Sequence, residues 1–442
     1  MASPTPADDR AMLSTRLVFP PLFWLCCMSP AHAGGDPDAT RLQVLGRNFY
    51  LDTDNHGALG ADNREWAQGF IARFESAFTP GVVGVGVDAQ GFAGFRLDSG
   101  RGRSGTGLLP VDDEGRAATD YSDAGLALKL RAADMRLSVG EMEVETPVFD
   151  TADKRLQPEY ASGALLQGAV QGYDWSAGRF HAFRNQNETS SDSDFDGYGA
   201  STRGSSISFA GIQSPGSEPW GGALYAGSLS DTWNQLYANL HQRTDFAAGR
   251  SFSWTLDAYR TRDTGSAKAG AIDTLAWSLF GKLTLGAQAF ALGYQKIHGD
   301  TPFDFVGGDS IYLANAIKYA DFNGPNERSL QARYDLDLAT LLPGLTFMAR
   351  YVRGSDIDGT HALLDGAYTR FDAQLQQQVP TQGKGGKHWE RDLDLAYRVA
   401  SGQAAGTLLH FTYVSHRANA AQAGRDIDRI YLVLEYPFEL IR

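Results

Sequence analysis

The chain has 442 residues, of which 43% are hydrophobic and 11% aromatic, and this composition excludes a disordered protein. Its 39 basic and 52 acidic side chains give a formal net charge of -13, which argues against duplex DNA as a partner because DNA-binding proteins need clustered Lys and Arg. Only 2 cysteines are present, which excludes a disulfide-dense small domain and a cysteine-rich zinc array.

Residues 1–33 have the pattern of a secretory signal peptide. A weakly basic start is followed by a short apolar run at residues 17–28, and Ala31 and Ala33 then satisfy an A-x-A cleavage site. The apolar run is about half of the roughly 20 residues that a spanning helix needs, so cleavage is favoured over a membrane anchor. Cleavage after Ala33 removes both cysteines and leaves residues 34–442 as one domain.

The body of the chain alternates in polarity at every residue. The clearest runs are residues 251–260, 330–338 and 429–436, in which apolar side chains occupy every second position. This period of two marks strands with one apolar and one polar face. Turn-forming Gly, Pro, Asp and Asn separate the runs, and no long capped helical pattern lies between them.

Two all-β architectures fit this alternation. In a soluble exported sandwich, such as an adhesin, the apolar faces pack inside. In an outer-membrane barrel they face lipid, while the polar faces line the lumen. Tyr and Trp recur near the strand ends, as in a lipid-interface girdle, and mid-strand charges such as Arg333 and Asp335 suit a lumen. The pattern therefore favours a transmembrane barrel.

Long strings along the chain identify a family. They are residues 64–70 (Arg-Glu-Trp-Ala-Gln-Gly-Phe), 104–110 (Ser-Gly-Thr-Gly-Leu-Leu-Pro), 308–315 (Gly-Asp-Ser-Ile-Tyr-Leu-Ala-Asn), 321–325 (Asp-Phe-Asn-Gly-Pro), 331–336 (Gln-Ala-Arg-Tyr-Asp-Leu) and 343–348 (Pro-Gly-Leu-Thr-Phe-Met). In this order they resemble the OprD family of outer-membrane porins across nearly the whole mature chain. Residues 175–285 match only in general pattern and not in particular strings.

The resemblance implies a monomeric, antiparallel, up-and-down barrel of 18 strands with short periplasmic turns and long external loops. It also implies passive, selective uptake of small solutes that often carry a carboxylate. The mature chain is long enough for 18 strands of the roughly 9–11 residues that cross a membrane.

The family folds one loop into the barrel to narrow it, and the matching segment here is residues 147–163. It contains the candidate constriction residues Asp150, Arg155 and Tyr160. The alternative is an external loop that never enters the lumen.

The family also carries a ladder of basic side chains along one lumen wall, which guides carboxylates. The residues at matching positions are Arg47, Arg96, Lys129, Arg131, Arg333 and Arg350. For any one of them the alternative is a solvated charge at the rim. Toward the C-terminus the ladder positions carry no fixed charge; these are Ala396, His410, Thr412 and Tyr431. Arg398 and Arg429 lie two residues away on the same faces and offer compensation.

An acidic wall opposite the ladder is a further expectation. Asp304, Asp309 and Ser310 lie in a segment that matches a family loop folded toward the pore. Carboxylates there would attract the cationic end of a zwitterion such as an amino acid. Alternatively these residues only form turns, which Asp and Ser both favour.

The sequence predicts no cofactor and no dedicated metal site. Residues 192–197 look like the start of a calcium loop, but Arg203 stands where a bidentate Glu is required, so an acidic external loop is favoured and weak surface calcium binding is the alternative. The nine histidines show no zinc-ligand spacing. Neither a phosphate-binding loop nor a nucleophile elbow is present.

Together these features predict a passive outer-membrane channel for small solutes, amino acids or organic acids, and not an enzyme. The expected partners are the lipid bilayer, lipopolysaccharide and the barrel-assembly machinery, with no nucleic acid. The alternative from another class is an outer-membrane barrel enzyme, a lipase or protease.

Overall fold

The computed structural model describes residues 39–56, 61–193, 195, 206–216, 219–364 and 366–441. The predicted signal peptide at residues 1–33 lies outside these residues, as do Asp194, Asp196 and Arg203 of the calcium-like segment. Within the described ranges no helix is long and apolar enough to cross a membrane.

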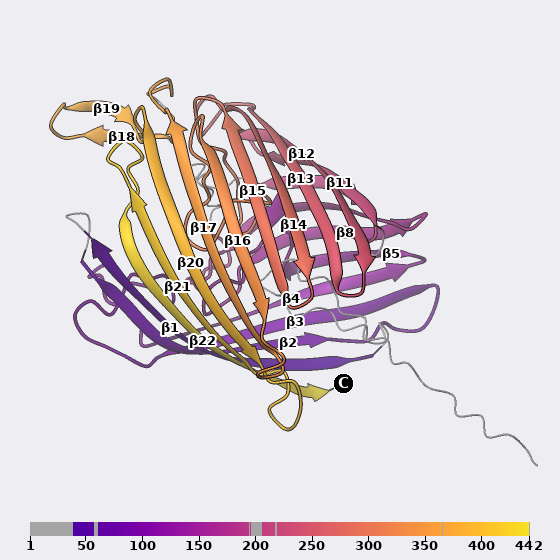
Figure 1. The fold of residues 1–442 in the computed structure, drawn as a ribbon. Coiled ribbons are helices and arrows are strands. Elements are labelled where there is room, and N and C mark those ends of the chain that lie inside the picture. Colours follow the sequence, from indigo (N-terminus) through magenta and orange to yellow (C-terminus); the bar gives the residue numbers. More distant parts are fainter. Residues whose placement is uncertain are drawn as a thin grey trace, which may run out of the picture.

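Eighteen antiparallel strands form a single sheet that closes on itself. They are β1 (Arg41–His56), β2 (Asn63–Glu75), β3 (Val83–Arg96), β4 (Asp120–Ala132), β5 (Met135–Met142), β8 (Tyr160–Val170), β9 (Tyr173–Arg184), β10 (Ile207–Gln213), β11 (Trp220–Leu229), β12 (Trp233–Ala247), β13 (Arg250–Asp263), β14 (Asp273–Leu285), β15 (Gln288–His298), β16 (Arg328–Asp337), β17 (Leu345–Ile357), β20 (Gly386–Arg398), β21 (Leu408–Ala418) and β22 (Asp426–Ile441). Strand β1 pairs with both β2 and β22, so the first and last strands close the ring (Figure 1). The predicted 18-stranded barrel is confirmed.

Two short strand pairs lie within the connections. Strands β6 (Glu145–Thr146) and β7 (Phe149–Asp150) pair in the loop between β5 and β8, and β18 (Thr369–Asp372) pairs with β19 (Gln377–Pro380) between β17 and β20. In Figure 1 the β18–β19 hairpin projects from the end of the barrel opposite the C-terminus.

The polarity of the strands is the reverse of that in a soluble protein. On β13, Ser251 and Asp257 are only 3% and 6% exposed, whereas Phe252 and Leu256 are 42% and 36% exposed. The same inversion leaves Leu292 on β15 71% exposed. A soluble sandwich would bury these apolar side chains, but a barrel turns them toward lipid and its polar groups toward the lumen. The sandwich alternative is therefore excluded.

The two ends of the barrel have different connections. At the end where β1 begins and β22 ends, turns are short; Gln171 and Gly172 join β8 to β9 with φ of 51° and 84°. Positive φ at both positions is what a type I′ hairpin turn requires. The opposite end carries the long loops at residues 97–119, 143–159, 299–327 and 358–385.

The interior is partly filled, because loop side chains pack against the inner faces of β8–β15. The apolar loop residues buried there include Phe149, Phe195, Phe303, Phe305, Val306 and Ile311. Burial of one such side chain stabilises by about 1.5–3 kcal/mol, so the loops are held in the lumen by a core of their own. The prediction of an inward-folded loop is confirmed, with a boundary correction: Tyr160 is not in the loop but begins β8.

Candidate permeation site

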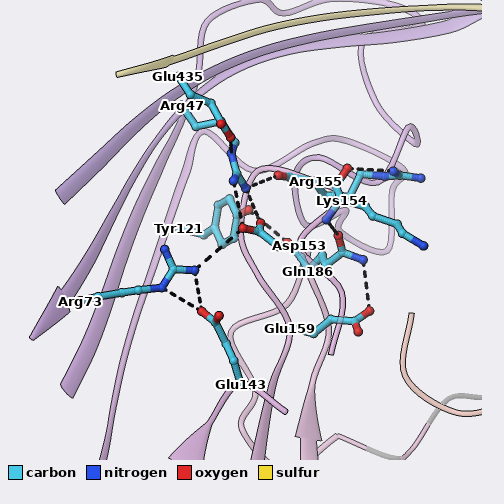
Figure 2. Close-up of polar contacts among 10 residues, drawn as sticks. All are labelled: Arg47, Arg73, Tyr121, Glu143, Asp153, Lys154, Arg155, Glu159, Gln186 and Glu435. Carbon is cyan, nitrogen blue, oxygen red and sulfur yellow. Dashed lines mark hydrogen bonds and ion pairs between the residues drawn. The ribbon is translucent and has the colours of Figure 1, made fainter. Parts of the chain in front are cut away.

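Arg47 fastens the β5–β8 loop (residues 143–159) to the seam between β1 and β22. Its Nη1 lies 2.5 Å from Asp153 Oδ1 and donates to the carbonyl oxygen of Arg155 at 2.8 Å. Its Nε donates to Glu435 Oε1 on β22 at 2.7 Å (Figure 2). All three contacts hold the buried guanidinium in place, so Arg47 acts as an anchor for the loop.

A second arginine supports the same loop. Arg73 on β2 places Nη2 2.6 Å from Glu143 Oε1 and 3.8 Å from Asp153 Oδ2 (Figure 2). Burial alone would raise the pKa of Asp153, but the adjacent Arg47 guanidinium outweighs this effect and holds that pKa below its ordinary value. Asp153 therefore stays ionised between two cations.

The β5–β8 loop also contacts the β15–β16 loop (residues 299–327). The buried carboxylate of Glu159 accepts the backbone N–H of Ala152 at 2.7 Å and that of Gly308 at 2.9 Å. Burial raises the pKa of Glu159 to about 7, against the opposing effect of these two N–H donors. The link between the two loops thus contains a group that titrates near neutrality.

Three predicted site residues meet at this loop contact. The backbone N–H of Asp150 donates to Ser310 Oγ at 2.6 Å, and the Tyr312 hydroxyl donates to Asp150 Oδ2 at 2.6 Å. Lys154 forms an ion pair with Asp309. The structure therefore brings Asp150, Asp309 and Ser310 together as connections between the two loops.

Asp304 does not join the predicted acidic wall. It is fully buried, and its Oδ2 accepts a hydrogen bond of 3.0 Å from Trp233 Nε1 on β12. Burial raises the pKa of Asp304 to about 7. The carboxyl group fixes the start of the β15–β16 loop to the inner wall of the barrel, because it contacts a buried tryptophan and not the open part of the lumen.

The far part of the β15–β16 loop docks on the wall near the seam. Glu390 on β20 accepts the backbone N–H groups of Tyr319 at 2.9 Å and Ala320 at 2.8 Å. Because its first part is held at β12, the loop crosses the lumen from one wall to the other.

A hydrogen-bonded histidine pair supports the end of this loop. His388 Nε2 lies 2.7 Å from Glu327 Oε1, and its Nδ1 lies 2.9 Å from His416 Nε2. His416 Nδ1 lies 2.7 Å from the carbonyl oxygen of Arg425, which can only accept. His416 Nδ1 therefore donates to that oxygen, and the chain of contacts joins Glu327 in the loop to β20 and β21. No sequence pattern indicates this network.

Most of the predicted basic ladder is engaged in ion pairs. Lys129 lies 2.5 Å from Asp88, Arg333 lies 2.7 Å from Asp335, and Arg350 lies 2.5 Å from Asp392. Arg47 is held as described above. These four cations are compensated by carboxylates on the same strand, on a neighbouring strand or in a loop, so their charge is not fully available to a solute.

The other two ladder residues make different contacts. Arg96 donates to the carbonyl oxygen of Ala117 at 2.5 Å, and the guanidinium of Arg131 lies 4.7 Å from the ring centre of Phe78. Arg155 in the constriction loop donates to the carbonyl oxygen of Lys154 at 3.0 Å. Tyr160 is buried, with the Arg184 guanidinium 5.8 Å from its ring centre.

Two cations that contact tyrosine rings lie where the β15–β16 loop meets β22. Lys318 Nζ is 4.6 Å from the ring centre of Tyr431, and the Arg429 guanidinium is 5.9 Å from the same ring. Arg429 also lies 4.9 Å from the ring centre of Tyr319 and donates to Thr53 Oγ1 at 2.9 Å. Among the described residues neither cation forms an ion pair. We call Lys318, Tyr319, Arg429 and Tyr431 the cation–tyrosine cluster.

The two expected compensating arginines have separate environments. Arg429 belongs to the cation–tyrosine cluster, whereas Arg398 is exposed and donates to the carbonyl oxygen of Gly406 at the turn end. At the uncharged ladder positions, His410 Nε2 and Thr412 Oγ1 both contact Asp394 Oδ2, at 2.6 and 2.7 Å. Lys318 was missed because an isolated lysine in a loop carries no periodic signal.

A cavity of about 660 Å³ opens at the turn end of the barrel, below the β5–β8 loop. Its charged lining residues are Arg41, Lys129, Arg131, Arg136, Glu75, Asp134, Glu145 and Asp174. Both signs are equally represented, so this vestibule has no strong charge preference of its own. In the described part of the chain, no group of three or more His, Cys, Asp or Glu residues is placed to hold a metal ion.

Residues 37–440 match a family model described as outer membrane porin, OprD family. The chain belongs to the OprD family. It is 39% identical to Porin D of Pseudomonas aeruginosa over 422 residues, which cover 93% of each protein. It is 31% identical over 447 residues to the porin-like protein GalP of Pseudomonas putida, covering 97% of this chain and 100% of that protein.

A solved structure shares the fold of this porin. The crystal structure of Pseudomonas aeruginosa OpdK with vanillate matches with a TM-score of 0.79 and 34% identity, covering 90% of this chain and 98% of that one. Family membership and this match confirm the predicted resemblance and place the porin in the outer membrane. The relatives are porins and not enzymes.

Proposed function

We propose that this porin passes small solutes bearing a carboxylate, and that the cation–tyrosine cluster is the point at which the carboxylate is held. The observation that carries the proposal is the pairing state of the lumen cations. Arg47, Lys129 and Arg350 face carboxylates within 2.7 Å, whereas Lys318 and Arg429 share one tyrosine ring and form no ion pair among the described residues.

The chemistry of the cluster suits a weakly held anion. A guanidinium and an ammonium group both donate charge-assisted hydrogen bonds to carboxylates. Lys318 and Arg429 are only partly buried, so an anion held there stays partly solvated and binds weakly enough for release, which conduction requires. The rings of Tyr319 and Tyr431 add a surface for an aromatic or alkyl body. The relative crystallised with vanillate, an aromatic carboxylate, supports this class.

The two inward loops supply the size limit in this proposal. The β5–β8 loop is fixed by Arg47 and Arg73, and Glu159 and Asp150 connect it to the β15–β16 loop. A loop held by ion pairs at one wall and by hydrogen bonds at the other keeps a constant opening. Asp150 and Arg155 then act on selectivity through the shape of that opening.

The export and assembly of the chain belong to the same proposal. We expect cleavage after Ala33, insertion by the barrel-assembly machinery and function as a monomer. The support is the signal-like segment at residues 1–33 and the complete closure of the sheet, which leaves no barrel edge for a second chain.

The test compares a carboxylate with its amide. Full-length porin is reconstituted in a planar bilayer, and benzoate or benzamide is added to one side while the KCl current is recorded. Benzoate should reduce the current at a lower concentration than benzamide does. Removal of one charge-assisted hydrogen bond at a partly solvated site costs about 1.4 kcal/mol, or tenfold. The Lys318→Gln/Arg429→Gln double variant removes two such donors and should therefore need roughly a hundredfold more benzoate.

Arg398→Gln is the matched control, because it removes one positive charge from the exposed turn end. It should leave the benzoate response unchanged. Equal effects of benzoate and benzamide on the native porin, or an unchanged response in the double variant, would contradict the proposal. Hydrolysis of a fluorescent ester by the purified protein would instead support the barrel enzyme.

A further inference from the structure

Four cations surround one tryptophan on the outer surface of the barrel. Trp389 on β20 lies opposite Arg353 on β17 and Arg417 on β21, and these strands lie side by side (Figure 1). Lys387 and Arg391 are two residues before and after Trp389, so they share its face. The intervening His388 and Glu390 are buried in the lumen, at 4% and 0% exposure, which shows that the Trp389 face points outward. We call Arg353, Lys387, Arg391 and Arg417 the basic patch.

The basic patch lies at the loop-side edge of the apolar belt. Toward the turn end, the outer faces of β20 and β21 carry Leu395, Leu409 and Phe411, which are 41%, 47% and 36% exposed. Aromatic rings mark the edge itself: the ring centres of Tyr351 and Trp389 are 6.0 Å apart. Aromatic girdles of this kind occur at the membrane–water interface, so the patch lies at the height of lipid headgroups.

The charge of the basic patch is only partly compensated. Arg417 pairs with Asp428 at 2.9 Å. Arg391 donates to Ser415 Oγ at 3.3 Å and lies 6.0 Å from the Tyr413 ring centre. Among the described residues, Arg353, Lys387 and Arg391 form no ion pair, and all three are exposed.

Such an arrangement is unfavourable without an external anion. Like charges on neighbouring positions of adjacent strands repel one another, and cations on a lipid-facing surface are costly. The planar guanidinium group of arginine donates two parallel hydrogen bonds to phosphate oxygens, and the lysine ammonium group adds a point charge. The outer leaflet of an outer membrane consists of lipopolysaccharide, whose phosphates lie at the headgroup level.

We propose that the basic patch binds the headgroup phosphate of a lipopolysaccharide molecule. Arg353, Lys387 and Arg391 donate to the phosphate oxygens, while Trp389 and Tyr351 contact the sugar and the first part of an acyl chain. The exposed basic groups, the exposed Tyr351 and the half-buried Trp389 thus form one surface that is complementary to a phosphorylated lipid. The proposal concerns the outside of the barrel and does not depend on which solute the porin carries.

The test titrates full-length porin, refolded in detergent without lipopolysaccharide, with purified lipopolysaccharide and with a dephosphorylated sample. Binding is followed by native mass spectrometry at two salt concentrations. Native porin should retain lipopolysaccharide, lose affinity at least tenfold on dephosphorylation, and bind more weakly at high salt. The Arg353→Gln/Lys387→Gln/Arg391→Gln triple variant should also bind at least tenfold more weakly.

Arg262→Gln is the matched control. Arg262 is exposed on the outer face near the loop end of β13, five strands from β20, or roughly 24 Å along the sheet at about 4.8 Å per strand. It should leave binding unchanged. Single-channel conductance identical to native porin confirms that a variant has folded, and Arg353→Gln alone serves if the triple variant does not fold.

Equal binding by the triple variant, or undiminished binding of the dephosphorylated sample, would overturn the proposal. Dimerisation of native porin without lipopolysaccharide, if the triple variant abolishes it, would also overturn it and assign the patch to a second copy of the chain.

Discussion

Replacement of Arg47 by glutamine should release the β5–β8 loop. Arg47 is 5% exposed and contacts Asp153, Glu435 and the carbonyl oxygen of Arg155. Removing one partner from a buried ion pair costs about 3–5 kcal/mol. Arg73 remains 3.8 Å from Asp153, so the lower end, about 3 kcal/mol, is appropriate. This shifts the equilibrium between docked and released loop by about a hundredfold.

Single-channel recording is the suitable assay. Native porin should show a steady current, whereas Arg47→Gln should show a larger mean conductance with frequent fluctuations as the loop leaves and re-enters the lumen. Asp153→Asn should produce the same change, because it removes the other side of the contact. The double variant should be little worse than either single variant, since both mutations break one interaction.

Two controls separate an anchor from a ladder residue. Arg47→Lys keeps the charge but removes the fork that reaches Asp153 and Glu435 together, so its current should be intermediate. A residue that served only to attract anions would leave the conductance noise unchanged in Arg47→Gln and alter anion permeability alone. That result, with Asp153→Asn shifting permeability in the opposite direction, would refute the anchoring role.

Three further outcomes follow from the loop contacts. The pKa of Glu159 is about 7 while the loop is docked, and it returns to the ordinary value of 4.5 when the loop is released. The docked loop therefore retains a proton that the released loop loses. Docking should weaken as the pH rises from 4.5 to about 7. Current fluctuations should increase from pH 5 to pH 8, and Glu159→Gln should flatten that trend. Asp304→Asn should leave the reversal potential unchanged, because its buried carboxyl contacts Trp233 and no permeant; a shift of several millivolts would place it in the lumen. His388→Gln should make the β15–β16 loop more sensitive to added protease than it is in the native porin, because the variant breaks the contact with Glu327. Equal cleavage rates in the two proteins would show that this contact does not stabilise the loop.

Much of the architecture could be predicted from the sequence. The alternating runs at residues 251–260, 330–338 and 429–436 correspond to β13, β16 and β22, with their apolar faces outward, although Leu338 lies just beyond the end of β16. A period of two indicates strands, but it does not indicate the side of the sheet that faces water. The aromatic residues near strand ends and the mid-strand charges favoured the barrel over the sandwich, the family strings strengthened that choice, and the exposed leucines confirm it.

The pairing of the site residues could not be predicted. Arg47 and Glu435 are 388 residues apart and become neighbours only because the barrel closes between β1 and β22. Lys129 and Asp88 meet through strand register, and no local pattern shows that a carboxylate faces a ladder cation. Basic residues could therefore be located, but their compensation could not.

The loops were the least predictable part of the site. Aspartate is a residue type that favours turns, yet Asp304 is buried against Trp233. That contact depends on the path of the β15–β16 loop across the lumen. Lys318 occupies the same loop with no neighbouring signal, and its partner Tyr431 comes from β22. Contacts between a loop and a distant strand depend on tertiary packing.

The most direct test of the central claim is the reversal potential of the reconstituted porin under a KCl gradient. If Lys318 and Arg429 attract anions within the path, native porin should prefer chloride over potassium. The Lys318→Gln/Arg429→Gln variant should then shift the potential toward potassium, while Arg398→Gln should not. A native preference for potassium, or an unchanged potential in the double variant, would contradict the claim that these two side chains guide carboxylates through the channel.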